Sequence, residues 1–320
     1  MTPVRLLLNS GFTGANAFFA LAQAHGLFRE AALDVRFTPG RGAYTAASRL
    51  VQEGFDAAYG DVNALIEMAA RNPSEDLPIA IFMAHQHAPS CIAVARAGPI
   101  HRPADLAGRR IVGHASDVAL RTFAAYARSA ALASDAVQID TSDAGMAELL
   151  LGMLDGKTDA VFGYTTTHTA ALAGARLAAG DVVRFLPYRD VCVALYGSAL
   201  MASPQFIRDH PAALVQLLGA TRAAMVAAHA QPQAAIDAVL SLNPQADRQI
   251  EGERWQGTLT GDMGWPPGMP GGWEGLGDVE NQRLAAAIEN LSAAFGWLHT
   301  PTTQRVFTRR FFAGNAPASG

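Results

Sequence analysis

The sequence has few cysteines, little net charge and no long apolar run, and each absence excludes a class of protein. Its 320 residues include only Cys91 and Cys192, too few for a disulfide framework or a four-cysteine metal site. The formal net charge is −4, whereas binding to nucleic acid would require clustered lysine and arginine. No run of 18 apolar residues is present, so we expect no membrane-spanning segment.

Motifs of several enzyme classes are also missing. The sequence has no G-x-S-x-G nucleophile elbow, no H-E-x-x-H zinc motif and no G-x-x-x-x-G-K-[ST] phosphate loop. The segment Gly40–Thr45 begins like a dinucleotide-binding fingerprint, but threonine stands where the third glycine belongs. His85 and His87 put two imidazoles on one side of an extended segment, without a recognisable third zinc ligand. We therefore predict no catalytic residue, no cofactor and no metal.

The sequence is instead built from repeated units of strand, glycine-marked turn and helix. Half of the residues are hydrophobic, and 320 residues exceed the usual size of a single core. The first three strand–helix pairs are predicted at Val4–Leu8 with Ala15–His25, Leu33–Thr38 with Ala43–Gln52, and Phe55–Tyr59 with Val62–Ala70. The second three are predicted at Arg110–Val112 with Asp117–Ser129, Val137–Asp140 with Ala144–Leu154, and Asp159–Phe162 with a helix from Thr166. This alternation predicts parallel sheets and two α/β lobes of similar build.

Two further extended segments are the natural places for the chain to cross between the lobes. They are Ile79–Ala95 and Val191–Tyr196, and each contains one of the two cysteines. Whether the two thiols are free and buried or form a disulfide stays open. Helices are predicted at Pro211–Ala230, Pro232–Leu240 and Asp278–Phe295, with an irregular loop at Gly261–Gly277 because of its proline and glycine pairs.

The candidate ligand-binding residues lie on the turns that follow the predicted strands. In open α/β sheets, ligands bind outside the carboxyl ends of the strands, where helix N-termini present free N–H groups. The candidates from the first lobe and the first crossing are Ser10, Phe12, Arg41, Tyr44, Gly60, Asp61, Asn63 and His85. Those from the second lobe and the second crossing are Ser116, Asp117, Asp143, Tyr164, Thr165 and Tyr188. Two facing lobes would aim these residues at one small molecule.

Each candidate also has a purely structural interpretation. Asp61, Ser116 and Asp143 are good helix N-caps, and capping alone would explain them. Tyr44 and Tyr164 would then be ordinary half-buried aromatic residues. Arg41 would be a solvated loop charge.

Five segments, spread along the chain, carry a resemblance to a known family. Gly26–Phe37 reads like "G-[YF]-F-x-x-A-G-L-x-V", with Ala32 in place of the usual glycine, and Arg102–Gly113 reads like "P-x-D-L-x-G-K-x-I-G". Gly54–Asp61 and Gly156–Val161 fit two "G-x-x-D-A" strands. In these segments, and in the helix from His210 to Ala224, the sequence resembles the ABC-transporter solute-binding proteins of the thiamine-precursor, sulfonate and nitrate group (NMT1/THI5-like and SsuA-like proteins).

The resemblance implies a type II periplasmic binding protein fold with two α/β lobes, a hinge and a ligand cleft between the lobes. The lobes would comprise residues 1–89 with 194–320, and residues 90–193, with hinge crossings near 85–95 and 188–198. The family implies a periplasmic monomer that delivers a small molecule to an ABC permease in the inner membrane. The sequence opens on a strand without a secretion signal, which fits either a cytosolic protein or a mature periplasmic start.

The resemblance leaves the ligand and one alternative function open. Family ligands include pyrimidine precursors of thiamine, aromatic acids, sulfonates and nitrate. The aromatic and acidic candidates favour a flat nitrogen heterocycle, because Asp61, Asp117 and Asp190 could accept hydrogen bonds from an amino group. The alternative is an enzyme on the same fold, of the menaquinone-pathway or thiamine-pyrimidine type. The Cys-rich iron motif of the latter is missing. A ligand-sensing domain would need an attached DNA-binding or membrane segment.

Overall fold

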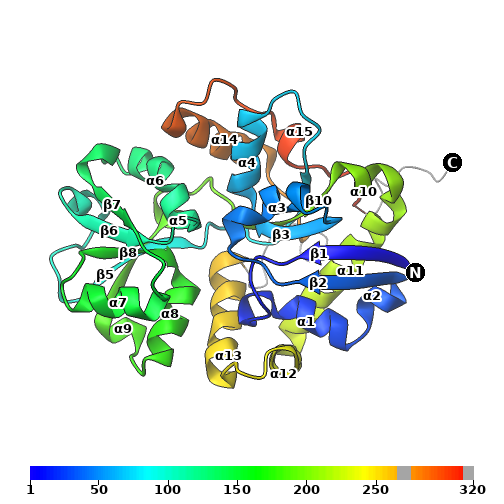
Figure 1. The fold of residues 1–320 in the computed structure, drawn as a ribbon, viewed down its shortest axis with the longest axis horizontal. Coiled ribbons are helices and arrows are strands. Elements are labelled where there is room, and N and C mark those ends of the chain that lie inside the picture. The colour runs from blue at the N-terminus through cyan, green and yellow to red at the C-terminus, as the bar shows by residue number, and fades with distance from the viewer. Residues whose placement is uncertain (265–274, 313–320) are drawn as a thin grey trace.

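Two five-stranded sheets organise the protein into two lobes that lie side by side (Figure 1). The computed structural model describes residues 1–264 and 275–312. The sheet of the first lobe has the order β2 (Leu33–Thr38), β1 (Thr2–Leu7), β3 (Ala57–Asp61), β10 (Ser198–Ala202) and β4 (Ile79–Met83). The sheet of the second lobe has the order β7 (Gln138–Thr141), β6 (Arg110–Gly113), β8 (Ala160–Tyr164), β5 (Ser90–Ala95) and β9 (Val183–Pro187).

The two sheets share one strand order, which explains the near-repeat of Glu53–Gly60 in Asp155–Gly163. In the first lobe β1 lies between β2 and β3, and in the second β6 lies between β7 and β8. The strands β10 and β5, each of which follows a crossing between the lobes, lie beside β3 and β8. The predicted parallel pairing is confirmed within each series, where β1 pairs with β2 and β3 and β6 pairs with β7 and β8. Each sheet is nevertheless mixed, because β10 runs antiparallel to β3 and β4, and β5 runs antiparallel to β8 and β9. A strand that enters the sheet from the other lobe arrives without a βα crossover and is free to pair in this way.

Helices cover both faces of each sheet, and their ends follow local sequence signals. In the second lobe they are α5 (Val118–Arg121), α6 (Phe123–Ser129), α7 (Met146–Leu154), α8 (Thr165–Gly174) and α9 (Ala179–Val182). Those before the first crossing are α1 (Ala17–Ala24), α2 (Leu27–Glu30), α3 (Ala46–Gln52) and α4 (Val62–Arg71). Those after the return are α10 (Pro204–Asp209), α11 (Pro211–Ala230), α12 (Pro232–Leu242), α13 (Arg248–Gly257), α14 (Asn281–Phe295) and α15 (Thr303–Val306). Proline opens α10, α11 and α12, where its missing N–H has no helical partner.

Helix α11 is long and apolar enough to cross a membrane by length and composition alone. Half of its apolar window is buried inside the protein, however, and Leu214, Leu217 and Met225 belong to the same core cluster as Phe18 of α1. Its apolar residues are therefore those of a core helix.

The chain passes between the lobes in two segments, between β4 and β5 and between β9 and β10. The second crossing differs from the prediction, since Val191–Tyr196 is not a strand. The backbone N–H groups of Val191 and Cys192 both donate to the carbonyl oxygen of Tyr188, which turns the chain before it can extend. The strands β9 and β10 that flank this turn were not predicted.

Helices from the C-terminal third also contact the second lobe. Helix α13 packs beside α8, as Figure 1 shows, and Gly257 makes this possible, because a Cβ atom there would lie 2.9 Å from Cγ2 of Thr166. Helix α14 packs against α6, where the Asn290 amide donates to Ser129 Oγ at 3.0 Å. Neither α10 nor α13 was predicted. Most of the predicted irregular loop at Gly261–Gly277 lies outside the described residues.

Candidate functional site

The turns after the strands of the two lobes meet around one cavity of about 340 Å³. Its walls come from three residues of the first lobe and eight of the second: Arg41, Gly42, Ala43, His114, Ser116, Asp117, Val118, Met146, Gly163, Tyr164 and Thr167. Four predicted site residues therefore lie together here, namely Arg41, Ser116, Asp117 and Tyr164. The cavity has the size and position expected for a small-molecule site between domains.

Asp61 ends β3 in the first lobe and begins α4. Its Oδ1 accepts hydrogen bonds from the backbone N–H of Asn63 at 2.9 Å and from the Asn63 side-chain amide at 2.8 Å. The predicted capping role is therefore present. Asp61 is completely buried, and burial raises the pKa of its carboxyl to about 7 despite these bonds. Its second oxygen, Oδ2, has no hydrogen-bond partner in the described part of the chain.

Asp117 is an N-cap in the second lobe, as Asp61 is in the first. It precedes α5, and its Oδ1 accepts a hydrogen bond from the backbone N–H of Ala119 at 2.9 Å. Burial raises the pKa of this carboxyl to about 6, although its capping bond and the nearby His114 oppose the rise. The two acids thus cap helices that follow strands of the two lobes, Asp61 after the third strand of its series and Asp117 after the first.

Tyr164 ends β8, and its hydroxyl lies among acidic groups from both lobes. Burial raises the pKa of this phenol well above its ordinary value, and the carboxylates of Asp61, Asp117 and Asp262 add to the rise. The hydroxyl is buried, and it has no hydrogen-bond partner among the described residues. Thr165 follows at the start of α8, where its backbone N–H donates to the carbonyl oxygen of Pro89 in the first crossing.

Asp262 is a buried acid in the lining of a cavity, and it was not predicted as a candidate. It lies in the helical turn Thr258–Asp262 after α13, is buried, and has a pKa raised by burial to about 7, an effect that Arg189 opposes. Asp61 and Asp117 were chosen as candidates because each lies at a turn after a predicted strand. No strand precedes Asp262, which lies in a segment predicted to be irregular.

A second cavity of about 190 Å³ lies between the start of α8 and α13. Thr165, Thr166 and Arg189 line it from the second lobe, and α13 and Asp262 line it from the first. The Arg189 guanidinium donates to the carbonyl oxygen of Gly261 at 2.9 Å, which fixes a positive charge at this mouth of the cleft.

His85 lies in the first crossing and is buried. Its Nε2 is 3.1 Å from the hydroxyl of Tyr59, and burial lowers the pKa of the imidazole to about 3, so the ring is neutral near pH 7. The other nitrogen, Nδ1, has no partner within residues 1–264 and 275–312. The described residues contain no group of three or more His, Cys, Asp or Glu side chains placed to hold a metal ion.

Several predicted residues lie elsewhere. Tyr188 is fully buried in the second lobe, where it stacks on Tyr126 at 4.3 Å and donates to the carbonyl oxygen of Ala119 at 2.6 Å. Phe12 packs edge-on against Phe37 at 5.3 Å, and its neighbour Ser10 donates to the carbonyl oxygen of the following glycine at 3.0 Å.

Three more predicted residues have identifiable local surroundings. Tyr44 donates to the carboxylate of Glu67, while the guanidinium of Arg121 from the second lobe lies 5.0 Å from the centre of its ring. Tyr44 is therefore part of a contact between the lobes. Gly60 has no room for a side chain, because a Cβ atom would lie 2.3 Å from that of Ala46. Asp143 is exposed.

Both cysteines are free and buried, which settles the alternative left open by the sequence. Cys91 Sγ lies 3.4 Å from Nδ1 of His168, and Cys192 donates to the carbonyl oxygen of Ala125. Burial raises the pKa of both thiols, so neither is a reactive thiolate near pH 7.

Comparison with known proteins identifies a family and a fold. A family model described as NMT1/THI5 like matches residues 15–235, and no curated protein matches the sequence. Among solved structures, the periplasmic aliphatic sulphonate binding protein SsuA from Escherichia coli aligns with a TM-score of 0.72 and 14% identity, over 98% of this chain and 99% of that one. The alkanesulfonate-binding protein SsuA from Xanthomonas axonopodis pv. citri, bound to MOPS, aligns with a TM-score of 0.68 and 14% identity, over 96% of each chain.

A third solved structure extends the likeness of fold beyond bacterial proteins. A Candida albicans protein with the generic periplasmic binding protein fold aligns with a TM-score of 0.66 and 11% identity, over 97% of each chain. These alignments confirm the predicted fold class of two α/β lobes.

Proposed function

Because this chain belongs to the NMT1/THI5-like family, we propose that it is the solute-binding component of an ABC importer and binds a small polar molecule between its lobes without chemical change. The observation that carries this proposal is the cavity of about 340 Å³, whose lining joins Arg41 and Gly42 of the first lobe to Ser116, Asp117 and Tyr164 of the second. A ligand held by both walls would favour the closed arrangement of the lobes, which is how hinged binding proteins respond to solute.

The proposal includes the division of the chain and its location. Residues 1–89 and 194–320 would form the first lobe and residues 90–193 the second, with the hinge in the two crossings near 85–95 and 188–198. The protein would act in the periplasm as a monomer and pass its ligand to a permease in the inner membrane. The similar proteins described as periplasmic support this location.

The proposed ligand is a flat nitrogen heterocycle of the thiamine-precursor type, in preference to an aromatic acid, a sulfonate or nitrate. Asp117 supplies an acceptor and Tyr164 an aromatic ring in the lining of the cavity, and Asp61 adds a buried carboxyl at the end of β3. Arg41 is the feature that would favour an anion, but it is exposed at the rim.

A thermal-shift screen of pyrimidines, sulfonates and aromatic acids tests this function. A ligand that binds only the folded protein adds about 2.7 kcal/mol to the free energy of unfolding at a hundred times its dissociation constant, so a true ligand should raise the melting temperature clearly. Ser116→Trp, which fills the cavity, should abolish that rise, and Ser74→Trp, at an exposed loop position, should keep it. A rise that survives Ser116→Trp, or no rise with any solute, would contradict the proposed function.

A further inference from the structure

We propose that Arg121 is a positioning residue, whose contact with Tyr44 and Glu67 stabilises the arrangement in which both lobes line the cavity of about 340 Å³. The inference rests on the proposed solute-binding function and adds to it the side chain that keeps the two walls of the cavity together. Arg121 ends α5 in the second lobe, whereas Tyr44 and Glu67 belong to the first. None of the three is part of the lining, so Arg121 acts through the segments that are.

The contact combines an ion pair with an aromatic ring. A guanidinium nitrogen of Arg121 lies 3.4 Å from Oε2 of Glu67. The guanidinium carbon lies over the ring of Tyr44, 5.0 Å from its centre, where the face of a ring attracts a cation. The hydroxyl of Tyr44 donates a hydrogen bond to the same Oε2 of Glu67. The first lobe thus presents a charged acceptor and a ring face, already joined to each other, to one guanidinium of the second.

The pair of Arg121 and Glu67 is the only ion pair that joins the two lobes in the described part of the chain. Each of the other ion pairs there connects two residues of the same lobe. The lobes also touch where Arg189 donates to the carbonyl oxygen of Gly261, but that contact lies at the smaller cavity. At the larger cavity, charge pairing between the lobes therefore depends on Arg121.

The contact is directly connected to both walls of the cavity. Tyr44 follows Gly42 and Ala43, which line the cavity from the first lobe. The backbone N–H of Arg121 donates to the carbonyl oxygen of Asp117 at 2.9 Å, and Asp117 lines the cavity from the second lobe. About one turn of chain or less therefore separates the contact from each wall, so the walls can separate only when the contact breaks.

The contact can break reversibly, because Glu67 keeps two partners in its own lobe. Arg71 of the same helix donates to its Oε1 at 2.8 Å, and Tyr44 donates to its Oε2. Burial acts to raise the pKa of Glu67, but the hydrogen bonds from Tyr44 and Arg71 and the charge of Arg121 lower it overall, so the group is a carboxylate. The side chain of Arg121 is 42% exposed. Such a contact shifts the balance between joined and separated lobes without fixing it.

Single-molecule fluorescence energy transfer in the full chain, without any solute, tests the inference. Dyes attached through Ser74→Cys in the first lobe and Lys157→Cys in the second, both at exposed positions, report the distance between the lobes. Cys91 and Cys192 are buried and should stay unlabelled. Arg121→Met should raise the ratio of separated to joined lobes by about three- to tenfold, the combined effect of an exposed ion pair and a cation–π contact.

Arg71→Met is the matched control, because it removes the other guanidinium on Glu67 without affecting a contact between the lobes. It should leave the ratio unchanged. Glu67→Gln should raise the ratio by itself, but should change it by less than about twofold when Arg121→Met is already present, since Glu67 acts on the second lobe through Arg121. Both arginines are exposed, so each variant should fold, as circular dichroism can confirm.

An unchanged ratio in Arg121→Met, or an equal increase in Arg71→Met, would overturn the inference. Independent effects of Arg121→Met and Glu67→Gln that add in the double variant would overturn it as well. Because no solute is used, this result is separate from the proposed function, whose failure would show as no thermal shift with any solute of the wider screen.

Discussion

At the scale of single residues, two opposing electrostatic effects act on the carboxyl group of Asp61. Its carboxylate caps α4, where negative charge is favourable, yet it lies in a fully buried position that penalises charge. Burial is the larger effect, since the pKa is raised to about 7 from an ordinary value of 3.8. An asparagine could keep the capping bond without the charge.

The change Asp61→Asn should therefore alter how stability depends on pH. A raised pKa in the folded state means that the folded protein holds a proton that the unfolded chain has lost, so the stabilising contribution of Asp61 is present below about pH 4 and is lost as pH rises through about 7. Without ligand, Asp61→Asn should be more stable than the wild type by about 1 kcal/mol or more at pH 8, and less different at pH 4.

Urea unfolding across this pH range measures the effect. The exposed change Asp209→Asn serves as the control and should follow the wild-type curve at every pH. If the free energy of unfolding changes with pH in the same way for the wild type and for Asp61→Asn, the pKa of Asp61 is not raised in the folded protein.

The sequence placed several candidate residues correctly at the ends of strands, and four of them line one cavity, although their role in binding stays a prediction. Asp61, Asp117 and Tyr164 could be found because each ends or follows a strand whose pattern is readable, and parallel strands end at the same edge of a sheet. Tyr188 follows β9 in the same way, but packing against Tyr126 turns its ring into the core. Asp262 reaches the site only through the packing of α13 against α8, and such long-range packing has no local signal.

At the scale of elements, α14 joins the two crossings through one arginine. Arg283 donates to the carbonyl oxygen of Gln86 in the first crossing and to those of Val193 and Leu195 in the second, the latter two both at 3.0 Å. Its guanidinium also lies 4.0 Å from the centre of the Tyr196 ring. One side chain thus connects the two crossings by hydrogen bonds.

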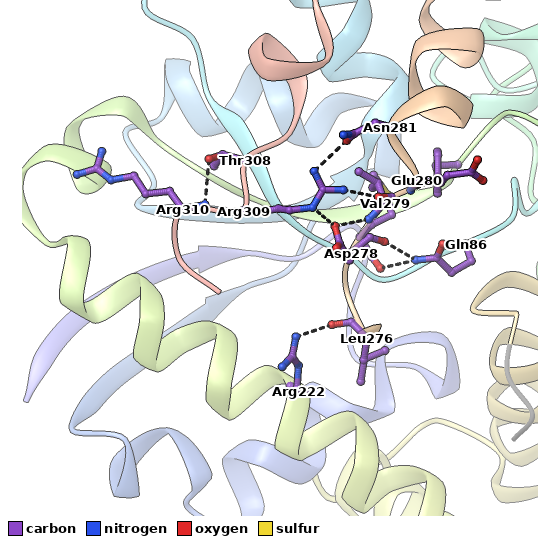
Figure 2. A network of polar contacts seen from close by, with 12 residues as sticks. Gln86, Arg222, Leu276, Asp278, Val279, Glu280, Asn281, Thr308, Arg309 and Arg310 are labelled. Carbon is purple, nitrogen blue, oxygen red and sulfur yellow. Dashed lines mark hydrogen bonds and ion pairs between the residues drawn. The ribbon is translucent and has the colours of Figure 1, made fainter. Parts of the chain in front are cut away.

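A network around Asp278 supports this arrangement, as Figure 2 shows. Arg309 pairs with the Asp278 carboxylate at 2.6 Å and donates to Asn281 at 2.9 Å, while Gln86 donates to the backbone carbonyl of Asp278 at 3.0 Å. Hydrogen bonds and an ion pair therefore connect the start of α14 to the C-terminal segment and to the first crossing.

We expect Arg283→Ala to loosen the hinge. It would remove the hydrogen bonds to three carbonyl oxygens, two of them partly buried, and should lower the free energy of unfolding by about 1–3 kcal/mol. Hydrogen exchange should become faster in residues 84–89 and 191–197. The control Arg36→Ala removes an exposed arginine of β2 and should change the free energy of unfolding by less than about 1 kcal/mol. Unchanged exchange in both crossings would mean that Arg283 does not hold the hinge.

Elements were predictable to the extent that their signals are local. The limits of α11 follow from two prolines and a long apolar pattern, and β2 was predicted with its observed bounds. The crossing Val191–Tyr196 has an apolar sequence typical of a strand, but turns formed with Tyr188 and Cys192 override that preference. The antiparallel strands β5 and β10 depend on which lobe each one enters, which local sequence does not specify.

At the scale of the whole molecule, the two lobes touch at points that surround the cleft. Arg121 of α5 pairs with Glu67 of α4 at 3.4 Å and lies over Tyr44, and α13 packs on α8 on the other side. The cavity lined by Arg41, Asp117 and Tyr164 lies between the lobes, so a solute held there would contact both of them. Opening and closing are thus part of the proposed function.

Small-angle X-ray scattering tests this account most directly. The radius of gyration should be smaller when the protein is saturated with the most stabilising solute from the screen than when it is free, and Ser116→Trp should show no such change. A scattering curve that is the same with and without a solute proved to bind would contradict closure of the two lobes on a ligand.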